Sequence, residues 1–450
     1  MWKQRFSPKS PIALSQCIIL LLIFFIGELV TMNACLAKEE NQEFNSLRLP
    51  FGDPKTRLDM AKVTLNAIYS AREGHDIDSD IFFRELGKTD IILIGESHTS
   101  DQHHQVQKRI IEGLTERGFK VVLGLEMFNP SQNQALADFI QGSIKEDDFM
   151  DKIGWFKSWS HNWRYYQPIF AYSRDHRIPM TGINIPHELV TKVRKSGLES
   201  LSEDERRQIP TPDTTNAEHR YFVNAMMQGI GAQAPEIFTG MYMSQCLWDA
   251  AMGEGAMMAA QKYPGAKIVV LAGTGHVAYN LGIARIIGNR SSFRTTTIIP
   301  VDIPGQENET SKSADDKTKN SKRQFSVHLG PASEKSDIPN SIISRGVADF
   351  FIGVTEEKFE KYPTLGLSLK DSSKGMEISI IFPETLAEKK GFKMGDLILQ
   401  VNGNSFANTV ELKKWMTFLD WEDQIDFLIL RDNKNIHVKF RLSPEPSETD

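Results

Sequence analysis

Cysteine is scarce in this chain of 450 residues, which contains only Cys17, Cys35 and Cys246. So few cysteines exclude a disulfide framework and a cysteine-type zinc site. An excess of positive charge is also missing, because the formal net charge is -6 at pH 7. The sequence therefore gives no electrostatic indication of nucleic-acid binding. Any bound metal ion would need histidine, carboxylate or tyrosine ligands.

The sequence also lacks an obvious membrane span at its N-terminus, where the apolar run at residues 17–26 is short for that purpose. Three basic residues precede this run, and a stretch containing small residues at 34–37 is followed by acidic residues. This layout is typical of a secretory signal peptide, here residues 1–37. We expect an exported protein, in the periplasm or membrane-associated in the cell envelope. The alternatives are a retained anchor and a lipoprotein that begins at Cys35.

Three strongly apolar runs end in residues that can carry chemistry. They are residues 91–94 with Glu96 and His98, 121–125 with Glu126, and 268–272 with His276. Short runs of this kind are typical of strands that are buried on both faces. Ligands of open parallel sheets bind beyond the carboxyl ends of the strands. We therefore expect these four side chains to converge in one pocket.

The chemistry of Glu96, His98, Glu126 and His276 leaves several interpretations open. Carboxylates and imidazoles together can hold a divalent metal ion and leave one position for water. Glu96 or Glu126 would then be the catalytic general base of a hydrolase. The carboxylates can also act on an ester without a metal ion. In the simplest alternative, the four groups have only a structural role and form hydrogen bonds and ion pairs with one another at the end of a buried sheet.

The spacing of strand, helix and strand between residues 91 and 125 predicts a βαβ unit, and hence a parallel sheet. The fold class that we expect is α/β, with a mainly parallel sheet flanked by helices and a separate small β-rich domain at the C-terminus. The expected parts are a signal peptide at 1–37, a polar N-terminal segment at 38–64, an α/β domain at 65–355 with a disordered insertion at 304–340, and the small domain at 360–445.

The small domain carries three matching segments, which are residues 365–367, 385–399 and 401–403. With them it resembles a PDZ domain of the bacterial type. The resemblance implies that a peptide adds as a strand and that its terminal carboxylate meets backbone N–H groups. The implied peptide-binding residues are Leu365, Gly366, Leu367, Ser368 and Leu369. The alternative is a PDZ fold that only packs against the first domain.

The α/β segment carries a longer series of matching motifs. They are residues 95–98, 103–104, 124–126, 163, 166–169, 184–186, 245–249 and 273–276. With them the segment resembles the ChaN family of haem-binding envelope proteins. This family shares a superfamily with Tiki metalloproteases and with erythromycin-esterase-like hydrolases, so the resemblance is more specific for the family than for an activity.

The ChaN resemblance implies haem held by a homodimer, with a tyrosine ligand to the iron and a histidine nearby. Tyr166 lies in a matching motif and Tyr279 lies just after His276, and the sequence does not choose between these tyrosines. The other residues that we expect at the cofactor are His98, His103, His104, Asn184, Gln245, Asp249 and His276.

Three functions follow from these patterns. The first is an envelope protein of iron uptake that binds haem or iron, with a PDZ domain that recruits a peptide or protein partner. The second is a metal-dependent peptidase or esterase of the Tiki type, with Mn, Fe, Co or Zn in place of haem. The third is a non-catalytic PDZ scaffold. The sequence alone does not decide whether the protein is an enzyme.

Overall fold

A computed structural model describes residues 46–159, 161–305 and 339–444. The expected signal peptide at 1–37 lies outside these residues, as does most of the expected insertion at 304–340. Among the described residues, no helix has both the length and the apolar character needed to cross a bilayer.

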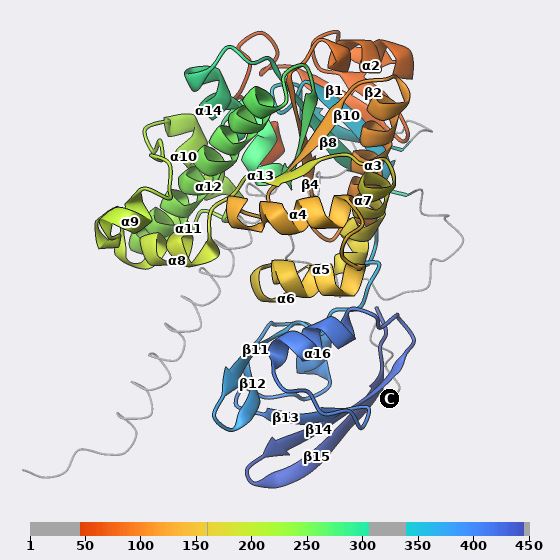
Figure 1. The fold of residues 1–450 in the computed structure, drawn as a ribbon, viewed down its shortest axis with the longest axis vertical. Coiled ribbons are helices and arrows are strands. Elements are labelled where there is room, and N and C mark those ends of the chain that lie inside the picture. The colour runs from red at the N-terminus through yellow and green to blue at the C-terminus, as the bar shows by residue number, and fades with distance from the viewer. Residues whose placement is uncertain (1–45, 160, 306–338, 445–450) are drawn as a thin grey trace, which may run out of the picture. The chain divides into compact units, whose positions relative to one another are not determined.

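The α/β domain is built on an eight-stranded sheet with the strand order β3-β2-β10-β8-β4-β7-β5-β6 (Figure 1). Pairing is parallel from β10 to β6, whereas β2 pairs antiparallel with β3 and β10. The strands are β2 (Ile68–Ser70), β3 (His75–Ile77), β4 (Ile91–Glu96), β5 (Val121–Leu125), β6 (Met180–Gly182), β7 (Lys267–Gly273), β8 (Thr295–Ile303) and β10 (Phe350–Thr355). The predicted α/β class with a mainly parallel sheet is confirmed.

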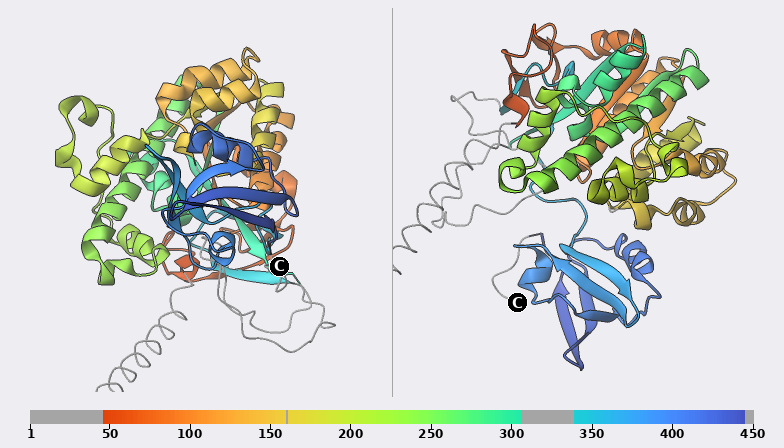
Figure 2. Two further views of the ribbon diagram at one scale, coloured as in Figure 1. Left: turned by 90° about the horizontal axis from the view of Figure 1, so that it is seen from below. Right: turned by 90° about the vertical axis from the view of Figure 1, so that its left-hand side faces the viewer.

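Helices cover both faces of this sheet, as Figures 1 and 2 show. The first face packs on α2 (Ser79–Gly87), α3 (Asp101–Glu116), α4 (Asn133–Ile140), α5 (Glu146–Ile153), α6 (Trp155–Ser158) and α7 (Trp163–Asp175). The second face packs on α12 (Pro235–Lys262), α13 (Thr274–Val277) and α14 (Ile283–Arg290). The remaining helical segments are α8 (His187–Ser196), α9 (Glu203–Arg206), α10 (Ala217–Met226) and α11 (Ile230–Gln233), with 3-10 turns at Ser46–Arg48, Pro130–Gln132, Leu198–Ser200 and Ala278–Asn280.

Strand alternation divides the apolar residues between the two faces. In β4, Ile92 and Ile94 belong to the core under α3 and α7, whereas Ile91 and Leu93 belong to the core under α12 and α14. Successive side chains of a strand point to opposite faces. The odd or even position of a residue along its strand, which we call its parity, therefore also decides the face toward which the last residue of the strand points.

The polar segment expected at 38–64 needs a correction at its end. Residues Met60–Thr64 form β1, which pairs antiparallel with β9 (Asn340–Ser344). Ala61 and Val63 are fully buried, while the residues between them face outward. The α/β domain therefore begins before residue 65. The two paired strands are nearly 300 positions apart, so local sequence gives little indication that they meet.

The C-terminal domain is a five-stranded antiparallel sheet in the order β11-β12-β13-β14-β15, with two helices. Its elements are β11 (Leu367–Ser372), β12 (Gly375–Ile381), α15 (Leu386–Lys389), β13 (Leu397–Val401), α16 (Thr409–Met416), β14 (Gln424–Arg431) and β15 (Lys434–Arg441). This antiparallel sheet agrees with the β-rich PDZ domain that the sequence led us to expect. Strand β11 lies at the edge of the sheet, which leaves one of its backbone sides without a strand neighbour among the described residues.

Candidate functional site

The first half of the site surrounds Glu96, the last residue of β4. Parity directs its side chain toward α3 and α7, where it is 1% exposed. Glu96 Oε1 accepts a hydrogen bond from the Tyr166 hydroxyl at 2.7 Å and lies 2.8 Å from His98 Nδ1. Its other oxygen accepts a bond from Gln107 Nε2 at 2.5 Å, and His104 Nδ1 lies 3.5 Å away.

These partners keep Glu96 ionised although it is buried. Burial by itself would raise its pKa, but His104 and His98 outweigh that effect and hold the pKa well below the usual range of a carboxyl group. Burial acts against the charged form of His98, and the carboxylates of Glu96 and Glu126 offset it, so the pKa of His98 is raised. The result is a buried carboxylate beside an imidazole that favours its protonated form.

The second half of the site lies on the opposite face of the sheet. Glu126 follows β5 with the parity of Val122, which faces α12. One Glu126 oxygen accepts a hydrogen bond from the Gly273 backbone at 2.7 Å, and the other lies 3.3 Å from His276 Nε2. His276 Nδ1 lies 2.6 Å from Asp249 Oδ1, and Asp249 comes from the long helix α12.

His276 is thus held between two carboxylates. Burial alone would lower its pKa, but Glu126 and Asp249 outweigh it and raise the pKa to about 10. The same contacts hold the pKa values of Glu126 and Asp249 below their usual ranges, against the opposing effect of burial. At neutral pH His276 therefore carries a positive charge between two negative ones.

Gly273 lies where the two halves meet at the sheet edge. A Cβ atom on this residue would lie 3.1 Å from His98 Nε2 and 3.8 Å from Glu126 Oε2. The missing side chain lets the His98 ring lie over the edge, within electrostatic reach of both Glu126 and His276. The four predicted residues thus gather at one edge of the sheet, as two pairs that approach from opposite faces.

The predicted metal set of Glu96, His98, Glu126 and His276 is not arranged around a single point. In the part of the chain that the structure describes, no group of three or more His, Cys, Asp or Glu side chains has an arrangement that could hold a metal ion. Strand parity gives the physical reason, because Glu96 and Glu126 project to different faces of the sheet.

The other predicted residues are distributed around this edge. His103 accepts a hydrogen bond from the Ser97 backbone at 2.9 Å and its other nitrogen lies 3.3 Å from Asp302, so it fixes the loop after β4 rather than facing the cluster. Asn184 donates to the Glu126 carbonyl at 2.9 Å. Gln245 Nε2 lies 2.8 Å from His276 Nδ1.

Sequence reasoning missed His219, which lies on α10 and extends the second half of the site. Its Nε2 atom lies 3.1 Å from Asp249 Oδ2, close enough for an ion pair but not aligned as a hydrogen bond. Both side chains are fully buried. No motif surrounds His219 in the sequence, so only the three-dimensional packing of α10 on α12 reveals it.

Sequence reasoning also missed that the rings of Trp159, His161 and His98 pack together as an aromatic wall. The ring centroids of His98 and His161 are 4.6 Å apart, and Trp159 lies 5.0 Å from His98. Burial, followed by the charge of His98, lowers the pKa of His161 to about 3. No ring nitrogen of His161 has a hydrogen-bond partner among the described residues. Trp159 Nε1 is buried and likewise has no acceptor there.

The two candidate tyrosines are both enclosed. Tyr166 is fully buried and donates to Glu96. Tyr279 is 1% exposed, and its hydroxyl accepts a hydrogen bond from the Leu49 backbone at 2.8 Å. Burial raises the pKa of both hydroxyl groups, so neither is readily converted to a phenolate.

The predicted peptide site in the C-terminal domain begins with a tight loop. Gly366 has φ +72°, and a Cβ atom there would lie 2.2 Å from the Thr385 side chain, so only glycine fits. The carbonyl groups of Leu365 and Gly366 accept bonds from Ala387 and Phe382. Their own N–H groups donate to no acceptor among the described residues. Leu367, Ser368 and Leu369 continue this loop into the edge strand β11.

Comparison with known proteins gives two family matches. Residues 82–287 match the family described as "Haem-binding uptake, Tiki superfamily, ChaN". Residues 363–442 match the PDZ domain family.

Two curated bacterial proteins match a short part of the chain. A probable periplasmic DegP-like serine endoprotease of Marinomonas sp. (strain MWYL1) is 35% identical over 78 residues, which is 17% of each protein. A probable periplasmic serine protease of the do/HhoA-like type from Haemophilus influenzae is 30% identical over 76 residues, or 17% of this chain and 16% of that protein. The chain thus spans about one sixth of the length of these relatives.

Among solved structures, ChaN of Campylobacter jejuni with cofacially bound haem is 16% identical, covers 65% of this chain and 97% of its own, and has a TM-score of 0.46. A mutant erythromycin esterase in its open conformation is 12% identical, covers 66% of this chain and 97% of its own, and has a TM-score of 0.35. The family matches alone identify two parts of the chain: residues 82–287 match the ChaN family of the Tiki superfamily, and residues 363–442 match the PDZ domain family.

Proposed function

We propose that this protein is exported to the cell envelope, where its ChaN domain binds haem for iron uptake and its PDZ domain captures a partner peptide. The observation that carries the haem proposal is the wall of Trp159, His161 and His98 at the carboxyl edge of the sheet. Flat rings, a neutral imidazole and an indole N–H without an acceptor are suited to a large planar ligand that contains iron.

The individual residues fit haem unequally. His161 has unshared ring nitrogens and a low pKa of about 3, so at neutral pH its lone pair is available to iron. Trp159 can donate its buried Nε1–H group to a polar group of the ligand. Tyr166 and Tyr279 do not fit the tyrosine ligation that the sequence led us to expect, because both hydroxyl groups are buried and hydrogen-bonded. When bound, haem would supply the iron and its redox chemistry.

Replacing His161 with alanine is expected to lower haem affinity by roughly tenfold or more. Replacing a residue that supports a metal site typically lowers metal affinity by at least this factor. The melting temperature without haem should stay within a degree or two of the wild type, because the ring makes no hydrogen bond among the described residues. Titration with haemin, followed by absorption, measures the affinity. His187→Ala is the matched control, since His187 is exposed at the start of α8.

Equal haem affinity in His161→Ala and His187→Ala would contradict this placement of the ligand. The size of the protein with and without haem, measured in the same titration by light scattering, tests the proposed homodimer.

A second candidate function is hydrolysis, and the contact between His276 and Asp249 favours it. A histidine held by a carboxylate at 2.6 Å has the orientation of an acid–base group, with Glu126 on its other nitrogen. In this case Glu96 or Glu126 would serve as a base, with or without Mn, Fe, Co or Zn. Hydrolysis of an ester or peptide substrate that is lost in Glu126→Gln would support this function over binding alone.

The PDZ domain is expected to bind peptides through their free C-terminal carboxylate. The free N–H groups of Leu365 and Gly366 lie directly before the open edge of β11, which gives a peptide both a carboxylate nest and a strand partner. Amidating the peptide should weaken binding by roughly tenfold or more, because charge-assisted hydrogen bonds are lost. Fluorescence titration of free and amidated peptides measures the difference.

Equal binding of both peptide forms would contradict the carboxylate nest. If no peptide in a library with free C-termini bound, the domain would be a packing module instead.

Export is proposed from the basic start and the apolar run of residues 1–37. N-terminal sequencing of the mature protein should find Lys38 first. A lipidated Cys35 would indicate a lipoprotein, and an intact Met1 in the cytosol would rule out export.

A further inference from the structure

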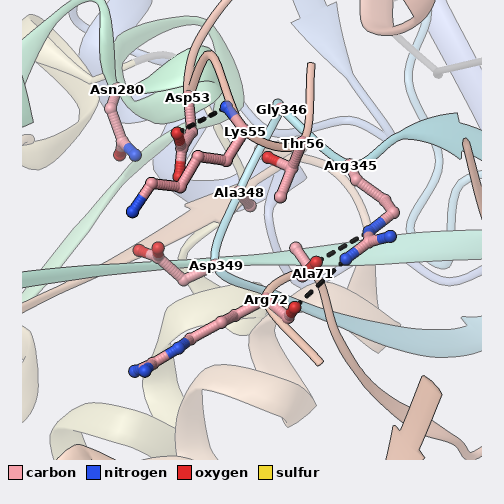
Figure 3. Close-up of a pocket in the computed structure, with 10 residues that line it drawn as sticks. All are labelled: Asp53, Lys55, Thr56, Ala71, Arg72, Asn280, Arg345, Gly346, Ala348 and Asp349. Carbon is pink, nitrogen blue, oxygen red and sulfur yellow. Dashed lines mark hydrogen bonds between the residues drawn. The ribbon is translucent and has the colours of Figure 1, made fainter. Parts of the chain in front are cut away.

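A cavity of ≈ 290 Å³ lies apart from the cluster at the sheet edge and shares no residue with it (Figure 3). Its lining comes from the segment before β1, the turn after β2, the turn after α13 and the loop between β9 and β10. The residues are Asp53, Lys55, Thr56, Ala71, Arg72, Asn280, Arg345, Gly346, Ala348 and Asp349. Six of these ten side chains are charged or carboxamide groups, so the cavity suits a small polar ligand.

Asp349 is the half-buried carboxylate of this cavity. One of its oxygens accepts a hydrogen bond from the Thr297 backbone at 2.7 Å, and no cationic side chain pairs with it among the described residues. The side chain of Asp349 borders the cavity, which leaves it partly exposed. Burial, and to a smaller extent the charge of Asp53, raises its pKa. A positively charged group in the cavity would relieve this penalty.

Close backbone packing and hydrogen bonds fix the segments that line the cavity around Asp349. The backbones of Gly52 and Gly346 approach so closely that a Cβ atom on Gly52 would lie 2.2 Å from the Gly346 carbonyl oxygen. Arg345 donates to the carbonyl groups of Ala71 at 2.7 Å and Arg72 at 3.1 Å. The cavity is therefore formed before any ligand arrives, which lowers the entropic cost of binding.

Three cations line the cavity with the two carboxylates, and one of them, Arg345, is paired with Asp59 at 3.1 Å. Lys55 is exposed, and its ammonium group forms no ion pair among the described residues. Arg72 has only a loose, solvent-exposed contact with Glu73 at 3.8 Å. Figure 3 shows the ends of both side chains on the same side of the cavity as the Asp349 carboxylate. Both cations thus remain available to a negatively charged group of a ligand.

We propose that this cavity binds a small zwitterion, of which a free α-amino acid is the simplest example. Its ammonium group would lie against Asp349 and Asp53, and its carboxylate against Lys55 and Arg72. The charges disfavour other small ligands. A phosphate dianion would meet the two carboxylates, and a divalent cation would find only two carboxylate side chains, with Lys55 beside them.

The volume restricts the ligand further. A cavity of ≈ 290 Å³ lies at the lower end of the usual range for small-molecule sites, so it accommodates one amino acid rather than a longer peptide.

Calorimetric titration of the full-length protein with glycine, alanine and larger amino acids tests this proposal. N-acetyl and methyl-ester forms, each lacking one charge, should bind roughly tenfold or more weakly. Asp349→Asn should weaken binding of the free amino acid by a similar factor, because it removes the charge but keeps an acceptor for the Thr297 N–H group. Lys55→Met should do the same. Lys62→Met is the matched control, since Lys62 is exposed on β1 and does not line the cavity.

Several outcomes would overturn the proposal. They are absence of saturable binding by any amino acid, equal binding of the blocked forms, tighter binding of inorganic phosphate or calcium, and unchanged binding by Asp349→Asn. The melting temperature of each variant, measured without ligand, shows whether it is folded. Asp349→Asn should match or exceed the wild type at neutral pH, because a half-buried carboxylate with a raised pKa opposes folding there.

Discussion

Replacing Glu96 with alanine is expected to lower the free energy of unfolding by about 3–5 kcal/mol, the range for removing one partner of a buried ion pair. The carboxylate is 1% exposed and accepts hydrogen bonds from Tyr166 and Gln107 while facing His98. Its removal would leave two buried donors without an acceptor and the partly buried His98 imidazole without its counter-charge. Urea unfolding of the two proteins, followed by circular dichroism, measures the difference.

Glu96→Gln separates charge from shape in this test. The amide retains one acceptor, so its loss of stability should be smaller than that of Glu96→Ala. Glu116→Ala, at an exposed position at the end of the same α3 helix, should change stability by no more than about 0.5 kcal/mol. Similar stabilities for Glu96→Ala and Glu116→Ala would mean that the Glu96 network contributes nothing to the fold.

Raising the pH from neutral toward 10 is expected to destabilise the protein by a few kcal/mol through His276. The pKa of this residue is raised to about 10 in the folded protein, from about 6.5 when unfolded. Its stabilising contribution is therefore complete below the unfolded value and is lost as the pH rises through the folded value. Each unit of pKa difference corresponds to about 1.4 kcal/mol.

The opposite sign holds on the acid side of the profile. The folded pKa values of Glu96, Glu126 and Asp249 are lowered, so their contribution is present above the unfolded value of about 4 and is lost as the pH falls. Stability measured against pH should therefore peak between the two limbs. His276→Gln should lose stability at neutral pH and should also flatten the alkaline limb. An alkaline limb that is unchanged in this variant would show that another group causes it.

The position of the site was predictable from sequence, because each of its strands ends a distinctly apolar run. Glu96, Glu126 and His276 lie at the carboxyl edge as expected, since parallel strands place these ends together. The arrangement of the site was less well predicted. The expectation of one shared pocket overlooked strand parity, which sends Glu96 toward α3 and Glu126 toward α12.

Other parts of the molecule depend on contacts that no local pattern records. His219 reaches Asp249 only because α10 packs on α12. Strand β1 pairs with β9, although most of the chain separates the two strands in sequence. The cavity at Asp349 joins four separate segments in the same way. The PDZ resemblance could be recognised from sequence because its matching segments lie within the 80 consecutive residues 363–442.

The absorption spectrum and metal content of the purified full-length protein, before and after addition of haemin, test the central proposal most directly. If the ChaN domain binds haem, haemin should produce a saturable Soret band, and the band should weaken in His161→Ala but not in His187→Ala. Stoichiometric Mn, Fe, Co or Zn without a Soret band would contradict haem binding and favour the hydrolase. Binding of neither haem nor metal at any concentration tested would contradict both functions proposed for the cluster at the sheet edge.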